Sequence, residues 1–110
     1  TFCYITDAIT GFLKVLIETK KPNVYNVGNP EPEIDMAALA ELFSKIANSK
    51  KGFELVKYPS SYPEDEPNRR CPNINKISEE LGYKPNVNLN DGLARFISWS
   101  QANYTYELTH

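Results

Sequence analysis

The chain has 110 residues, a length that fits one domain or part of one. Hydrophobic residues make up 41% and charged residues 24%, which is enough apolar material for a core, but the apolar runs are too short to span a bilayer. The formal net charge is −2, and the scattered basic residues form no stripe of the kind that binds nucleic acid. We therefore expect a cytoplasmic protein that binds neither membrane nor nucleic acid.

Cysteine and histidine are too scarce for most site chemistry. Cys3, Cys71 and the single histidine, His110, form no disulfide framework and have no metal-ligand spacing. The acidic run 64–66 lacks a further ligand at suitable spacing, so we interpret it as solvated charge. The sequence predicts no metal site. It also begins in mid-pattern at Thr1 without a leader, and we expect this residue to be a cut end.

The first part of the chain predicts two short strands around one amphipathic helix. Residues 2–6 are β-prone, and Asp7 is expected to cap the helix that follows. Apolar residues recur at helical spacing until Pro22 ends this helix. A second strand is predicted over residues 24–27, ending at Gly28 and a proline-rich turn.

The middle of the chain predicts a helix, a strand and a long loop. Asp35 is expected to cap the clearest helix in the sequence, whose apolar face extends to Ile46. Residues 53–58 alternate well enough for a third strand. The loop 59–72 contains four of the eight prolines, and a loop of this length inside a domain usually has a function.

Two further helices complete the pattern. Asn73 is expected to cap the first, Gly82 to close it in a left-handed conformation, and Asn90 to cap the second. The predicted fold class is therefore α/β, a small sheet with packed helices. The helix after Asp7 has more apolar surface than so small a sheet can cover. We expect a partner domain or a second copy to cover it, and the isolated chain to self-associate in light scattering.

Five segments, in this order and spacing, resemble one enzyme family. Residues 2–7 (Phe-Cys-Tyr-Ile-Thr-Asp) resemble its aromatic strand-to-helix element, and residues 25–29 (Tyr-Asn-Val-Gly-Asn) its Tyr-Asn-hydrophobic-Gly strand. Residues 69–76 (Arg-Arg-Cys-Pro-Asn-Ile-Asn-Lys), 81–85 (Leu-Gly-Tyr-Lys-Pro) and 89–93 (Leu-Asn-Asp-Gly-Leu) are similar to its tail. The family is that of the extended short-chain dehydrogenases/reductases acting on nucleotide-activated sugars, also called NAD-dependent epimerases/dehydratases.

The resemblance implies that residues 1–110 are the carboxy-terminal, sugar-nucleotide-binding domain of an extended Rossmann-type dehydrogenase. The implied parent is an NAD-dependent epimerase, dehydratase or decarboxylase of a UDP- or dTDP-sugar, similar to UDP-glucuronate decarboxylase, and a homodimer. The chain has neither a Gly-rich dinucleotide fingerprint nor a Tyr-x-x-x-Lys pair. We therefore expect NAD to be bound by an absent amino-terminal part, and this chain to be inactive alone, with no catalytic or cofactor-binding residue of its own.

Arg70 is the first candidate substrate-binding residue. In the family, the arginine two positions before this proline reaches the nucleotide diphosphate, and a guanidinium is a permanently charged, bidentate partner for phosphate. The alternative is a surface ion pair with a carboxylate of the run 64–66. Arg69 is expected to point the other way if the segment is extended, as solvated charge or, alternatively, in contact with ligand.

Tyr4 and two asparagines are weaker candidates. The family brings the segment around Tyr4 close to the nucleotide, but core packing with a bonded hydroxyl is the favoured explanation of a tyrosine there. Asn26 and Asn29 flank Gly28 where open α/β sheets place ligands, and turn chemistry is their alternative. The alternative function for the whole chain is a free-standing, non-catalytic interaction module that uses its apolar helix faces.

Overall fold

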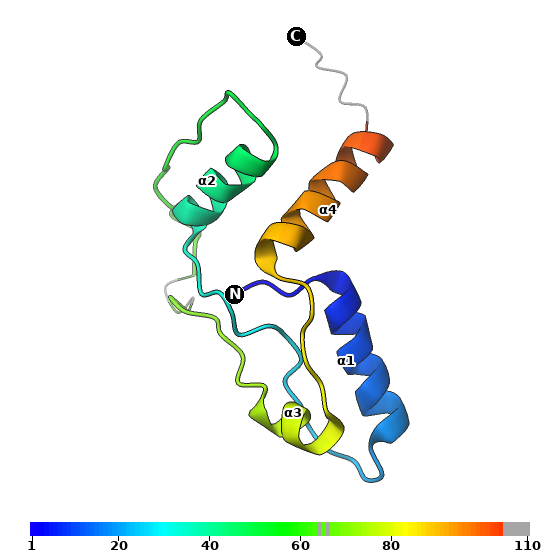
Figure 1. The fold of residues 1–110 in the computed structure, drawn as a ribbon. Helices are drawn as coiled ribbons and strands as arrows, with labels where there is room; N and C mark the ends of the chain where they lie inside the picture. The colour runs from blue at the N-terminus through cyan, green and yellow to red at the C-terminus, as the bar shows by residue number, and fades with distance from the viewer. Residues whose placement is uncertain (64, 66, 105–110) are drawn as a thin grey trace.

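Four helices joined by irregular segments make up the described part of the protein, residues 1–63, 65 and 67–104 of a computed structural model. They are α1 (Ile5–Glu18), α2 (Met36–Ile46), α3 (Asn75–Leu81) and α4 (Leu89–Asn103). Helices α1 and α3 pack together at one end of the molecule, and α2 and α4 pack together at the other (Figure 1). The segment between α3 and α4 connects the two ends.

The predicted α/β class with a small sheet is wrong, because the described residues contain helices and no strand. A β-strand needs a hydrogen-bonded neighbour, and the runs 2–6, 24–27 and 53–58 do not pair with one another. Helix α1 already begins at Ile5, which shortens the first run. In the third run Leu55 and Val56 are 77% and 79% exposed, so neither side of it packs on a core. Alternation of residue types did not by itself produce a strand.

Two predicted helix boundaries are confirmed and one is shifted. The Asp35 carboxylate accepts a hydrogen bond from the backbone N–H of Ala38 at 2.8 Å, as an N-cap should. Gly82 follows α3 with φ = 61°, the left-handed conformation expected of it. Helix α1 ends at Glu18, so it is shorter than the predicted helix that Pro22 was expected to end.

The asparagine caps differ from the prediction. Asn88, not Asn90, caps α4, and its side-chain oxygen accepts from the backbone N–H of Asp91 at 2.9 Å. Asn73 lies before α3 rather than at its N-cap, although its side-chain oxygen accepts from the N–H of Asn75 at 2.9 Å. At α4 the residue type is right and the position is wrong, because several neighbouring polar residues can satisfy the first N–H groups of a helix. At α3 the N-cap position is occupied by Ile74, which has no capping side chain.

Asp7 is not the cap of α1. Tyr4 occupies the N-cap position, and Asp7 lies in the first turn with only 5% of its surface exposed. Its carboxylate accepts the backbone N–H groups of Asn86 at 3.0 Å and Val87 at 2.9 Å. The residue therefore fixes the segment after α3 to the start of α1. Sequence cannot distinguish a carboxylate that caps its own helix from one that binds backbone far along the chain.

The most buried side chains gather around α1 and α3. Ile77 and Tyr83 are almost fully enclosed, and Ile97 of α4 is 7% exposed. Gly11 lets α1 approach closely: a Cβ at this position would lie 2.3 Å from Cγ1 of Val27 and 3.0 Å from Cε2 of Tyr83.

The outer face of α1 is apolar and exposed. Six large apolar side chains on this helix are 48% to 78% exposed: Ile5, Ile9, Phe12, Leu13, Leu16 and Ile17. The radius of gyration is 17.5 Å, against about 13 Å for a compact domain of roughly this length. The predicted excess of apolar surface is confirmed, whereas what covers it, and self-association, stay predictions. No described helix has the length and hydropathy needed to cross a bilayer.

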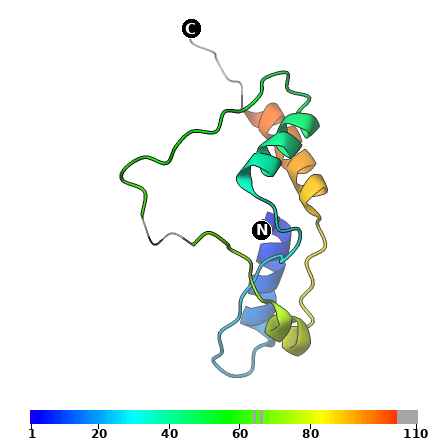
Figure 2. The same cartoon turned by 90° about the vertical axis from the view of Figure 1, so that its left-hand side faces the viewer.

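The described part of the loop 59–72 extends away from the helices and returns to them at its end (Figure 2). Near its beginning, the rings of Tyr58 and Tyr62 stack with their centroids 4.1 Å apart. Residues 64 and 66 of the acidic run, and His110, lie outside the described residues. The end of the loop, residues 69–72, is the part that contacts the body of the protein.

Candidate functional site

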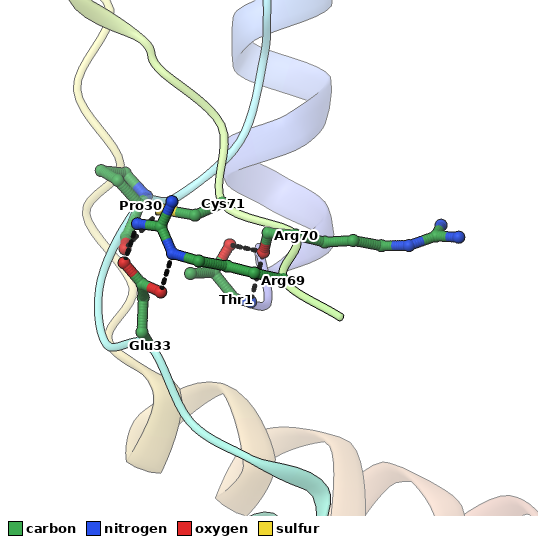
Figure 3. Close-up of polar contacts among 6 residues, drawn as sticks. All are labelled: Thr1, Pro30, Glu33, Arg69, Arg70 and Cys71. Carbon is green, nitrogen blue, oxygen red and sulfur yellow. Dashed lines mark hydrogen bonds and ion pairs between the residues drawn. The ribbon is translucent and has the colours of Figure 1, made fainter. Parts of the chain in front are cut away.

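The last residues of the long loop are held against two other segments of the chain (Figure 3). The backbone nitrogen of Thr1 donates to the carbonyl of Arg70 at 2.9 Å, and the thiol of Cys71 donates to the carbonyl of Pro30 at 3.5 Å. Pro72 packs on Gly28: a Cβ added to Gly28 would lie 2.8 Å from the Cγ atom of Pro72. These contacts fix the backbone on either side of Arg70.

A surface cavity of about 400 Å³ lies where the three segments meet. It is lined by residues of the ranges 1–3, 27–29 and 70–72, namely Thr1, Cys3, Val27, Gly28, Asn29, Arg70, Cys71 and Pro72. These ranges come from the first three segments of the family resemblance. The structure therefore brings together in one cavity elements that are far apart in the sequence.

Arg69 and Arg70 point in opposite directions, which is the alternation expected of an extended segment (Figure 3). Arg69 forms a bidentate pair with Glu33: its Nε atom donates to one carboxylate oxygen at 2.7 Å, and Nη2 donates to the other. The guanidinium hydrogen bonds hold the pKa of Glu33 below its ordinary value, and the carboxylate raises the pKa of Arg69. Arg70 is exposed and extends away from this pair.

The base of the cavity is held by a buried tyrosine. The hydroxyl of Tyr83 donates to the carbonyl of Gly28 at 3.1 Å and lies 3.8 Å from the thiol sulfur of Cys3. Burial raises the pKa of Tyr83 well above its ordinary value, and burial also raises the pKa of the Cys3 thiol. Both groups are therefore neutral at neutral pH, and neither is an activated nucleophile or base.

Tyr4 is not part of the Arg70 cavity. Its ring packs on Gly92, since a Cβ added to Gly92 would lie 3.1 Å from the ring carbon Cδ2 of Tyr4. The guanidinium of Arg95 lies 5.7 Å from the ring centroid. Tyr4 instead lines a separate, largely apolar cavity of about 330 Å³ between the start of α1 and α4. In this structure its surroundings are those of a packing residue, and its role as a substrate contact stays a prediction.

The two asparagines around Gly28 have different neighbours. The side-chain oxygen of Asn29 accepts the N–H of Glu31 at 3.0 Å, which is turn chemistry, but Asn29 also lines the Arg70 cavity. The side-chain amide of Asn26 donates to the carbonyl of Asn73 at 3.2 Å and so connects the second segment to the start of α3. Asn29 is the one of the pair that the structure places with Arg70.

The chemistry available in this cavity is the binding of an anion. Arg70 contributes a planar, permanently charged donor group, and Asn29 contributes an amide. Within the described ranges, no cluster of three His, Cys, Asp or Glu side chains has the geometry to hold a metal ion. Glu33 was missed by sequence reasoning, because a carboxylate 36 residues before Arg69 leaves no local signal.

Comparison with known proteins identifies the relatives of this chain. It is 34% identical to UDP-glucuronic acid decarboxylase 3 of Arabidopsis thaliana over 84% of its length, and 32% identical to UDP-glucuronic acid decarboxylase 1 of the same plant over 89%. It is 29% identical to the plant's UDP-D-apiose/UDP-D-xylose synthase 2 over 94% of its length. Its homologues are members of the extended short-chain dehydrogenase/reductase family. The family resemblance of the sequence is thereby confirmed.

The match to these extended short-chain dehydrogenases covers only part of each relative. The chain spans about a quarter of their length: 25% of decarboxylase 3, 21% of decarboxylase 1 and 30% of the synthase. No family model and no solved structure matches the chain. The relatedness therefore establishes the family, and the contribution of this particular segment has to be argued from its own residues.

Proposed function

We propose that this chain is the substrate-side part of an NAD-dependent nucleotide-sugar epimerase, dehydratase or decarboxylase. In this proposal Arg70 binds the diphosphate of the nucleotide. NAD and the residues that carry out catalysis belong to another part of the same enzyme, so the 110 residues alone are inactive. The enzyme acts in the cytoplasm as a homodimer.

One observation carries the proposal: Arg70 lines the cavity in which three segments of the family resemblance meet. A diphosphate needs fixed positive charge and several donors, and a guanidinium presents parallel N–H groups that match two phosphate oxygens. The backbone around Arg70 is held by the contacts to Thr1 and Pro30, so less conformational freedom is lost on binding. The names of the relatives favour a UDP-sugar over a dTDP-sugar.

The expected division of labour follows from the residues present. The chain contains neither a Gly-rich dinucleotide fingerprint nor a Tyr-x-x-x-Lys pair. The Tyr83 hydroxyl and the Cys3 thiol have raised pKa values, so both stay protonated at neutral pH and neither is available to accept a proton. Binding and orientation of the nucleotide are therefore the contribution that this segment can make.

The diphosphate contact is tested by titrating UDP into the 110-residue chain and following backbone amide shifts by NMR. We expect shifts around residues 27–29 and 70–72. Arg70→Ala should weaken binding about 10- to 100-fold, because a hydrogen bond to a charged group contributes roughly 1.5–3 kcal/mol. Arg69→Ala should have a much smaller effect. Absence of UDP binding, or equal and small effects of the two substitutions, would contradict the proposal.

The enzymatic part of the proposal is tested at the gene. A reading frame that continues upstream of Thr1 into a Gly-rich strand–turn–helix and a Tyr-x-x-x-Lys pair supports an enzyme. An initiator Met directly before Thr1 would instead support the non-catalytic interaction module, for which the exposed face of α1 provides the surface.

A further inference from the structure

We propose that Glu33 is a positioning residue for the nucleotide site: by binding Arg69, it fixes the orientation of the end of the long loop so that Arg70 faces the cavity. The inference rests on the proposed function of Arg70. It concerns a carboxylate that does not itself line the cavity.

The first argument is the alternation of side chains along residues 69–72. In an extended segment, neighbouring side chains point to opposite sides. When Arg69 is held by Glu33, the side chain of Arg70 is directed the other way, as Figure 3 shows. A rotation of the segment about its long axis would exchange the two arginines. The pair with Glu33 opposes this rotation.

The second argument is that, among the contacts described for the segment, the pair with Glu33 is the one best suited to fix its orientation. Thr1 binds the carbonyl of Arg70, and Cys71 contacts Pro30 through a weak thiol hydrogen bond. These contacts fix where the backbone runs. Arg69 is the neighbouring side chain with a charged, two-point partner on another segment, 36 residues away in the sequence. The planar, two-point geometry makes the pair sensitive to orientation in a way that a single bond is not.

The expected magnitude is modest. The side chains of Arg69 and Glu33 are 69% and 48% exposed, and exposed ion pairs contribute little except where the geometry is bidentate. We therefore expect Glu33→Gln to weaken UDP binding by about threefold to tenfold. The substitution replaces the carboxylate by a neutral amide, so the pair with Arg69 weakens and Arg70 is turned away from the cavity for more of the time. Because Glu33 is exposed, the variant should fold normally.

The test compares two probes that differ in phosphate, UDP and uridine, on the 110-residue chain. If Glu33 acts through Arg70, Glu33→Gln weakens UDP binding and leaves uridine binding unchanged. In an Arg70→Ala background, Glu33→Gln should have no further effect, because the group it positions is gone. The matched control is Glu41→Gln, an exposed carboxylate of α2, which should change neither affinity.

A charge-swapped variant sharpens the test. Glu33→Arg combined with Arg69→Glu restores the pair in reverse and should recover most of the UDP affinity that either single change loses. Equal loss of UDP and uridine binding by Glu33→Gln would indicate general disruption and overturn the inference. So would unchanged UDP affinity in Glu33→Gln when the parent chain binds UDP normally. If the parent chain binds no UDP, the proposed function fails and the inference falls with it.

Discussion

The two ends of the molecule are held together by different interactions. At the α1–α3 end, buried polar groups join distant segments: Asp7 binds the backbone N–H groups of residues 86 and 87, and Tyr83 binds the carbonyl of Gly28. At the α2–α4 end, α2 has no fully buried residue, and α4 buries only Gly92 and Ile97. The candidate cavity borders the first region, because Gly28, whose carbonyl Tyr83 binds, is one of its lining residues.

This difference indicates which residues matter for the site. Buried hydrogen bonds fix direction as well as distance, and breaking one leaves an unsatisfied group behind. Half-buried apolar contacts tolerate small shifts and substitutions more easily. The α1–α3 end, to which Tyr83 fixes Gly28, is therefore where substitutions should have the larger effects.

The largest effect on stability is expected for Asp7→Ala. The substitution removes the acceptor of two backbone N–H groups in a residue that is only 5% exposed. We expect a loss of about 2–4 kcal/mol in the free energy of unfolding, because hydrogen bonds to a charged group contribute roughly 1.5–3 kcal/mol. Urea denaturation measures it. Asp91→Ala, in the exposed first turn of α4, serves as the control and should lose about 1 kcal/mol or less. Similar losses from both would remove the contrast between the two ends.

A pair of glycine substitutions tests the close packing of α1. Gly11→Ala should destabilise the protein by about 1–3 kcal/mol, because its Cβ would overlap the side chain of Val27 and crowd the ring of Tyr83. Gly52→Ala has no atom within 4 Å of the added Cβ and should be nearly neutral. Thermal or urea unfolding of the two variants gives the comparison directly. A neutral Gly11→Ala would show that α1 can move away from Val27 without loss.

The smallest effect concerns Glu33, between the two ends. Its pKa is lowered from 4.5 by the hydrogen bonds from Arg69, so the ionised carboxylate is favoured in the folded protein. The contribution of the pair to stability is therefore fully present above pH 4.5 and is lost as the pH falls through the lowered pKa. An NMR titration of the Glu33 carboxyl should give a value below 4.5 that returns toward 4.5 in Arg69→Ala. A pKa of Glu33 that is the same in both proteins would mean that the pair does not form in solution.

Much of the local structure could be predicted from the sequence. The cap at Asp35, the left-handed Gly82 and the existence of the four helices follow from short-range rules, because the groups that satisfy each other lie within a few residues. The three predicted strands, by contrast, are absent from the described residues. A strand forms only when it pairs with a second strand, and the residues of one segment do not show whether such a partner exists. The alternating pattern of residues 53–58 was therefore not sufficient to make this segment a strand.

For the candidate site, too, the sequence predicted some features and left others to the tertiary structure. The resemblance selected Arg70 from its motif, and homology to nucleotide-sugar enzymes confirms the family to which that motif belongs. The sequence could not predict that Tyr4 lines a separate apolar cavity, or that Glu33 holds Arg69. Both depend on contacts between segments that are many residues apart. Short-range pattern carries no information about such contacts.

The sequence by itself determined the family, the helices and the type of group that could bind a phosphate. The tertiary structure alone decided that residues 1–3, 27–29 and 70–72 meet around one cavity, and that the two adjacent arginines point in opposite directions. The physical reason is that side-chain type and helix spacing are local properties. The direction in which an extended segment presents its side chains is fixed by partners elsewhere in the fold.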